Sequence, residues 1–135
     1  MKNIIPILFF ILSITSCSSS KTVLYDNDTF KIEEFSTDAS YGYSIKNPIK
    51  VGGAKEGIGP LNERRFLNAL AGPNGENVIY ERLGSVSNGG NEFTRVILDK
   101  YKITYDGLEE DIILYINMYK SDKLKVPVGF KLKYE

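Results

Sequence analysis

Residues 95–119 read RVILDKYKITYDGLEEDIILYINMY and hold the most regular pattern in the chain. Between Lys100 and Tyr105, apolar or aromatic side chains alternate with polar ones, a period of two that is typical of a strand with one buried face. After the loop DGLEE, residues 112–119 are nearly all apolar and rich in isoleucine and tyrosine, which indicates a central, buried strand. The segment therefore predicts two long neighbouring strands.

Further strands are predicted on both sides of this pair. NVIYERLGSV (residues 77–86) precedes it and FKLKY (130–134) follows it, each separated from it by a short polar loop. TFKIEEF (29–35) alternates as well, whereas Pro48 limits residues 46–51 to an edge or irregular strand. Strands joined in sequence by short loops predict an antiparallel meander of three or more strands.

One helix is predicted, at about residues 61–71. Gly59 and Pro60 open it, and Gly72 and Pro73 close it. At 100° per residue the apolar side chains share one face, which we expect to pack on the strands. The predicted class is therefore α+β, an antiparallel sheet with one main helix on one face.

Two sets of residues are expected to meet in that core. The helix contributes Phe66, Leu67 and Leu70. The strands contribute Val96, Leu98, Ile112, Leu114 and Ile116.

The N-terminus has the pattern of an export signal. Lys2 precedes the apolar run IIPILFFILSI (residues 4–14), which is too short to span a bilayer, since a helix needs about 20 residues for that. Ile14, Thr15, Ser16 and Cys17 then resemble a bacterial lipobox, in which the cysteine is acylated and becomes the first residue after cleavage. We expect a lipoprotein signal peptide at 1–16, a lipidated Cys17 with a tether at 17–22, and one globular domain at 23–135.

Composition narrows the classes of function. The chain has 17 basic and 17 acidic residues, and this balance argues against a nucleic-acid partner. It has no histidine and one cysteine, Cys17, which excludes histidine-based catalysis, histidine metal sites and an internal disulfide. No metal site, catalytic residue or cofactor is predicted, and an ordinary signal peptide followed by a chance cysteine stays the alternative to lipidation.

The glycine-rich stretch GGAKEGIG (residues 52–59) raises the question of an anion site. Its spacing matches neither the phosphate-binding loop nor the dinucleotide fingerprint. A weaker anion site near Lys55, Arg64 and Arg65 stays open as an alternative. We expect instead that Glu63 complements the helix dipole and that both arginines point to solvent. The glycine-rich stretch is then a connector.

Two further groups allow a binding interpretation. Glu109, Glu110 and Asp111 are expected to be solvated loop carboxylates, as are Asp26 and Asp28. Four tyrosines on the two central strands would form a glycan- or peptide-binding face if that side of the sheet were open, and core if the helix covered it. They are Tyr101, Tyr105, Tyr115 and Tyr119.

Several blocks resemble a small lipoprotein family of the Bacteroidetes group. They are YGYSIKNPIKVGG, GPLNERRFLNAL, GPNGE, LDKYKITYDGL, ILYINMY and PVGF, in this order between Tyr41 and Phe130. Members are often labelled 2-dehydro-3-deoxyphosphooctonate aldolase, an activity associated with a barrel of about 250 residues, which this chain is too short to build. Many members carry a Cys-Cys-Pro-Phe block where this chain has VSNGG after Gly84 and Ser85.

Together these features predict a lipid-anchored protein of the cell envelope that binds a ligand or partner, an envelope protein or a glycan, without catalysis. The alternative is a small envelope hydrolase or lyase with the anion site described above. Residues 18–21 (SSSK) lack the acidic residues that resemble a surface-export signal, so we expect the periplasmic side of the outer membrane.

Overall fold

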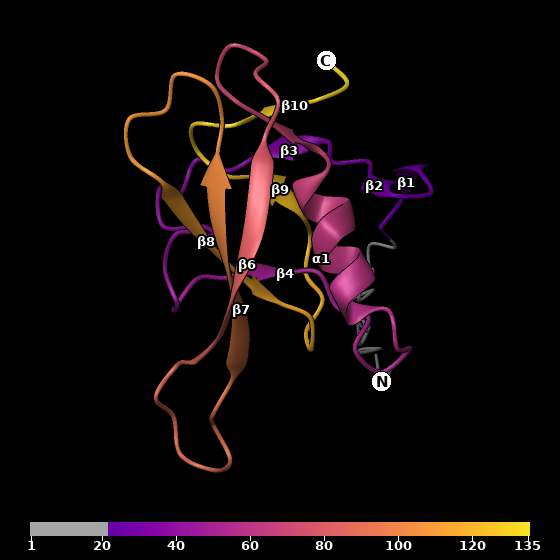
Figure 1. Ribbon diagram of the computed structural model, residues 1–135. Coiled ribbons are helices and arrows are strands. Elements are labelled where there is room, and N and C mark those ends of the chain that lie inside the picture. The colour runs from indigo at the N-terminus through magenta and orange to yellow at the C-terminus, as the bar shows by residue number, and fades with distance from the viewer. Residues whose placement is uncertain (1–21) are drawn as a thin grey trace, which may run out of the picture.

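The computed structural model describes residues 22–135 (Figure 1), so the predicted signal peptide, Cys17 and most of the tether lie outside the described residues. One helix and ten strands follow in the order β1 (Leu24–Asp26), β2 (Thr29–Phe30), β3 (Glu34–Phe35), β4 (Ile49–Lys50), α1 (Gly59–Leu67), β5 (Leu70–Ala71), β6 (Ile79–Ser87), β7 (Ile97–Thr104), β8 (Ile112–Asn117), β9 (Lys125–Val126) and β10 (Lys131–Leu132). Within residues 22–135 no helix has the length and apolar character needed to cross a membrane.

The main sheet has four strands in the order β4-β8-β7-β6. β7 pairs antiparallel with both β6 and β8, while β4 joins β8 in parallel. Three smaller sheets pair β1 with β2, β5 with β10, and β3 with β9. The expectation of a mainly stranded α+β protein with one helix is confirmed.

The expected antiparallel meander does not describe these sheets, which are small and mixed. Only Lys131 and Leu132 of the predicted C-terminal strand are extended, and they pair with β5 outside the main sheet. Both parallel pairs, β3 with β9 and β4 with β8, join segments far apart in sequence. Such pairings leave no short-range turn signal, so local pattern could not predict them.

The helix is shorter than predicted and ends at Leu67 instead of Ala71. Leu70 and Ala71 form β5, in which Leu70 is paired with Leu132 and Ala71 with Lys131. Tertiary pairing with the C-terminal segment thus overrides the helical periodicity of these residues. Leu70 still points into the core, where it is 2% exposed.

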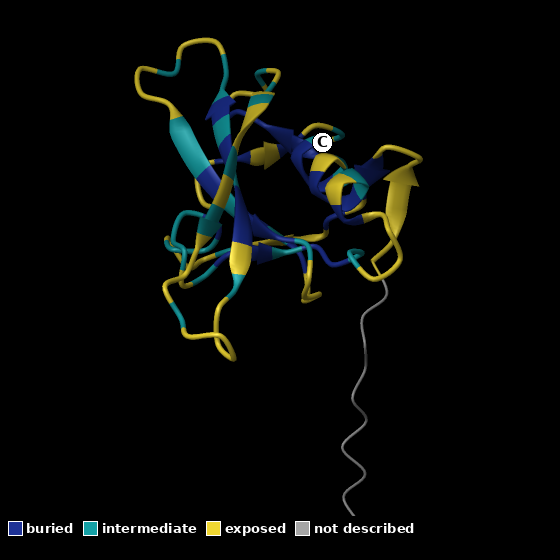
Figure 2. Ribbon diagram, turned by 60° about the horizontal axis from the view of Figure 1, so that its bottom comes forward, coloured by how far each residue is buried: buried dark blue, intermediate teal, exposed yellow. Residues whose placement is uncertain are grey.

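One hydrophobic core fills the space between α1 and the main sheet. Phe66 and Leu67 of the helix pack there with Tyr101, Leu114 and Ile116 of the sheet. In Figure 2, buried segments of the helix and of the central strands face each other. The loops and the far end of the β6–β7 hairpin are mostly exposed in the same view.

The prediction that Val96 and Leu98 meet the helix is wrong. Tyr101 and Ile103 occupy the core face of β7, so alternation directs Leu98 to the opposite face of the sheet, although it is buried there. Val96 precedes β7 and is half-buried. Ile112 packs at the margin of the core, while Leu114 and Ile116 are central to it as predicted.

A β-bulge interrupts β6 opposite the middle of β7. Arg82 pairs with Tyr101, but Gly84 pairs with Lys100 and Ser85 with Asp99, so one extra residue is inserted between them. A bulge re-aims the side chains that follow it. As a result both Arg82 and Ser85 lie on the side of the sheet that carries Asp99.

Candidate functional site

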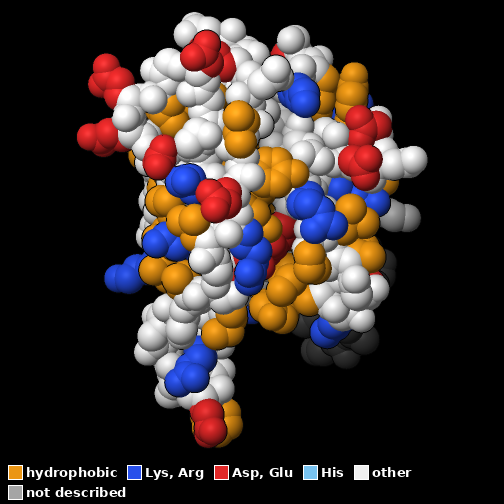
Figure 3. Space-filling view, viewed as in Figure 1, with side chains coloured by type: hydrophobic (Ala, Val, Ile, Leu, Met, Phe, Trp, Pro, Cys, Tyr) orange, Lys and Arg blue, Asp and Glu red, His pale blue; other side chains and the backbone are white. Residues whose placement is uncertain are grey.

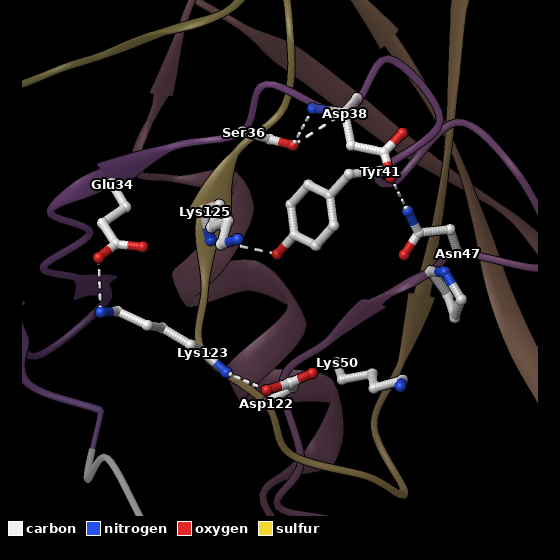
Figure 4. A pocket seen from close by; sticks show the side chains of 10 residues that line it. Glu34, Ser36, Asp38, Tyr41, Asn47, Lys50, Asp122, Lys123 and Lys125 are labelled. Carbon is white, nitrogen blue, oxygen red and sulfur yellow. Dashed lines mark hydrogen bonds and ion pairs between the residues drawn. The ribbon is translucent and has the colours of Figure 1, made fainter.

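A polar cavity of about 300 Å³ opens beside β3 and β9 (Figure 4). Its walls come from β3 with the following loop, from β4 with the residues before it, and from β9 with the residues before it. The lining residues are Glu34, Ser36, Asp38, Tyr41, Asn47, Pro48, Lys50, Asp122, Lys123 and Lys125. The cavity exists because β3 and β4 each pair in parallel with a strand near the C-terminus.

Hydrogen bonds fix the position of several cavity side chains. Lys123 Nζ lies 2.6 Å from Glu34 Oε1, and this contact holds the pKa of Glu34 below its ordinary value. Asn47 Nδ2 donates to Asp38 Oδ2 over 3.2 Å. The Tyr41 hydroxyl accepts from the backbone N–H of Lys125 over 3.1 Å, and burial raises the pKa of Tyr41 to about 12.

The cavity therefore presents ammonium and carboxylate groups around one neutral phenol. Lys50 and Lys125 lie in its wall with no ion pair among residues 22–135. Charged groups of both signs suit a polar ligand held by hydrogen bonds and ion pairs. The phenol is not poised to act as a base near neutral pH, because its raised pKa keeps it protonated.

A second polar group lies inside the fold and is centred on Glu63 of α1. The Glu63 side chain is fully buried, at 0% exposure, and faces the core side of β7. The Tyr101 hydroxyl donates to its Oε2 over 2.7 Å. Its Oε1 has no hydrogen-bond partner within the described part of the chain.

Asp99 links this buried carboxyl to the surface. Asp99 Oδ1 accepts from Arg82 Nη2 over 3.0 Å and from Ser85 Oγ over 2.8 Å, both placed by the β6 bulge. Burial favours the neutral acid, but these hydrogen bonds outweigh it and hold the pKa of Asp99 below its ordinary value. Asp99 is therefore an ionised carboxylate beside Glu63.

The pKa of Glu63 moves the other way. Burial is the main cause that raises it to about 8; the neighbouring Asp99 carboxylate acts in the same direction, and the Tyr101 hydrogen bond opposes both. Glu63 is thus a neutral acid at pH 7 and Asp99 its charged neighbour. A pair with such separated pKa values is typical of acid–base sites. Here a substrate has no access, since Asp99 is only 5% exposed and Glu63 is enclosed, so the pair is a structural network.

The structure does not bring the three predicted anion-binding residues together. Lys55 lies in the turn before α1, whereas Arg64 and Arg65 lie in its last turn, where cations complement the negative end of the helix dipole. Arg64 is exposed as expected. Arg65 is half-buried and donates to the carbonyl of Asn27 over 3.0 Å and to Asn62 Oδ1 over 3.2 Å.

The expected role of Glu63 was wrong. It is not in the first turn of α1, which has no acidic residue, and its buried carboxyl cannot act as a surface charge. The helical spacing of Glu63 from Phe66 and Leu67, three and four residues away, placed it on the apolar face and was the signal for burial. No sequence pattern predicted the contacts of Asp99, because its partners Arg82 and Ser85 are positioned by the bulge in β6.

The tyrosines and the acidic loop are dispersed over different surroundings. Tyr101 is buried in the core, Tyr105 packs edge-on against Phe130, and Tyr119 is exposed. Tyr115 lies on the opposite sheet face from Tyr101.

Of the predicted loop carboxylates, Glu109 and Glu110 border an open cavity of about 470 Å³, and Asp111, Asp26 and Asp28 are exposed. Within residues 22–135 no group of three or more acidic, cysteine or histidine residues is arranged to hold a metal ion.

No protein-family model matches this chain, and neither a curated protein nor a solved structure shows significant similarity to it.

Proposed function

We propose that this protein is a lipid-anchored component of the cell envelope that binds a ligand or partner without catalysis. Cys17 is the attachment point, and the protein faces the periplasm from the outer membrane. The observation that carries the proposal is the succession of Lys2, a short apolar run and the residues Ile14 to Cys17. The resemblance of six sequence blocks to small Bacteroidetes lipoproteins supports the same function.

The binding role is supported by the polar cavity in Figure 4. It is bounded by segments from both ends of the domain and lined by lysine and carboxylate side chains in defined positions. Its volume of about 300 Å³ is at the lower end of the range that small-molecule sites occupy. The buried Glu63 network supports binding over catalysis, because its two carboxyl groups are enclosed.

Lipid attachment is tested by expressing the full chain and its Cys17→Ala variant in a bacterium that makes lipoproteins, in the presence of a labelled fatty acid. We expect label on the wild type only, because the variant has no thiol. Ser18→Ala is the matched control and keeps the label. Several acyl chains make membrane binding stable, so the wild type also partitions into the detergent phase. Equal partitioning of wild type and Cys17→Ala into the aqueous phase contradicts the proposal.

The side of the membrane is tested separately by adding protease to intact and to permeabilised cells. Protection in intact cells and digestion after permeabilisation is the expected result, since Ser18, Ser19, Ser20 and Lys21 lack acidic residues. Digestion in intact cells indicates surface exposure and leaves the lipid attachment itself unaffected.

A further inference from the structure

The face of the main sheet that points away from the core carries a group of lysines. Lys100 and Lys102 alternate with the core residues of β7, and Lys50 extends from β4 on the same side. Lys46 and Lys120 lie next to Lys50 around a cavity on this side. We call these five residues the lysine face.

The cavity within the lysine face has a volume of about 330 Å³. Leu98, buried to 1% exposure, and the equally buried Asn117 contribute to its lining, together with Pro48. The cavity therefore combines an apolar and amide lining with three ammonium groups at Lys46, Lys50 and Lys120. This combination suits an anionic ligand that also has an apolar surface.

The surface continues from the cavity along the sheet. Tyr115 lies directly opposite Lys100 on β8, and Gly84 lies opposite Lys100 on β6. A Cβ at Gly84 would have no atom within 4 Å, so the space beside Lys100 is open on that side. Tyr115 is half-buried, so part of this residue is accessible beside Lys100.

Charge is unevenly distributed on this molecule. The chain has equal numbers of basic and acidic residues, yet the lysine face has five lysines and, in the strand register, one acidic neighbour, Glu81. Glu81 pairs with Lys102 over 3.1 Å. Within residues 22–135 the other four lysines have no ion pair. Figure 3 shows basic side chains interleaved with hydrophobic ones at the left edge of the molecule, below a group of acidic side chains.

We propose that the lysine face binds an acidic glycan. Carboxylate groups of the sugar chain pair with Lys50 and Lys100, and a sugar ring packs against Tyr115, whose flat ring suits the apolar face of a sugar. The concave cavity favours a single chain of rings over a flat membrane surface. The lysine face is a second binding surface beside the polar cavity in Figure 4, with which it shares Pro48 and Lys50. The proposal goes beyond the proposed function and does not depend on the lipid anchor.

The test uses the full chain purified in non-ionic detergent and polygalacturonate, a polymer of a carboxylated sugar, as the probe. We expect binding that weakens with added salt, because exposed ion pairs are screened. The variant Lys50→Gln/Lys100→Gln should raise the Kd by about tenfold, the size expected for two lost charge contacts. The matched control Lys131→Gln/Lys133→Gln removes the same charge elsewhere and should leave the Kd within about twofold.

The variant Tyr115→Leu distinguishes binding of a glycan from binding of other polyanions. It keeps every charge and should weaken polygalacturonate binding severalfold, whereas the neutral polymer dextran should not bind the wild type. Anionic phosphatidylglycerol vesicles and double-stranded DNA are the comparison ligands. Thermal unfolding shows that each variant is folded.

Three outcomes overturn the proposal: equal effects of the two lysine pairs, no effect of Tyr115→Leu, or tighter binding of vesicles or DNA than of polygalacturonate at the same face. A loss of fatty-acid labelling in the anchoring experiment leaves this measurement unaffected. The two proposals therefore fail independently.

Discussion

Replacing Glu63 with glutamine should make the protein more stable at alkaline pH. The side chains are nearly isosteric, so the core packing is kept. The amide oxygen still accepts from Tyr101, which now donates to Glu63 Oε2 over 2.7 Å. The amide nitrogen takes the position of the unpartnered Oε1 and points toward the Asp99 carboxylate as a donor.

The magnitude follows from proton linkage. The pKa of Glu63 rises from an ordinary value of 4.5 to about 8, mainly because of burial. Between these values the folded chain holds a proton that the unfolded chain has lost, so the free energy of unfolding falls as the pH rises. The two pKa values differ by about 3.5, and a difference of one in pKa corresponds to about 1.36 kcal/mol. The free energy of unfolding therefore falls by about 5 kcal/mol, which is an upper limit because the site can relax.

The pH window is therefore pH 4.5 to 8. Below it, Glu63 is neutral in both states and the wild type and Glu63→Gln should have similar stability. Above it, the wild type has two adjacent carboxylates, Glu63 and Asp99, and only the half-exposed Arg82 to compensate them. The variant lacks this penalty, so the difference grows with pH and levels off near pH 9.

Urea unfolding at pH 5, 7 and 9 measures the effect, with Glu109→Gln as a control that removes a carboxylate from an exposed loop. The control should follow the wild type at each pH. A Glu63→Gln protein that is less stable than the wild type at pH 9, or a difference that does not change with pH, would refute a neutral buried Glu63.

Other substitutions test the core by the same urea assay. Tyr101→Phe removes the donor to Glu63 and should cost about 1–3 kcal/mol, the penalty for an unsatisfied buried group, while an unchanged stability contradicts this contact. Leu70→Ala should cost about 2–5 kcal/mol although Leu70 is in a strand; a loss below about 0.5 kcal/mol would make β5 peripheral. Gly42→Ala and Gly57→Ala both force alanine to positive φ, at about 1–2 kcal/mol. Only at Gly42 does the new methyl lie 2.8 Å from a core isoleucine, so equal losses would contradict that packing.

Short-range patterns were sufficient for several features of this protein. Alternation between Lys100 and Tyr105 predicted β7, and the apolar run after Asp111 predicted β8 as a central strand. Pro48 limited residues 46–51 to an edge or irregular strand, and β4 is one of the two outer strands of the main sheet. These features depend on neighbouring residues alone, because side-chain period and backbone restriction are local properties.

The position of Glu63 in the helix also follows from the sequence. Its spacing from Phe66 and Leu67 predicts the same helical face, so a buried carboxyl was foreseeable. The neighbours of Glu63 could not be predicted from the sequence, because Asp99 and Tyr101 belong to β7 and not to the helix. Composition and the residues around Cys17 determine the expectation of a lipid-anchored protein, and this expectation does not depend on the fold.

Only the tertiary structure decided the rest. Leu70 and Ala71 leave the helix because Leu132 and Lys131 offer strand partners, a pairing across about 60 residues that no local pattern contains. The parallel pairs β3–β9 and β4–β8 build the polar cavity from distant segments. Strand partners are selected by the burial of side chains over the whole chain, and a sequence window reports only which residues prefer to be extended or buried.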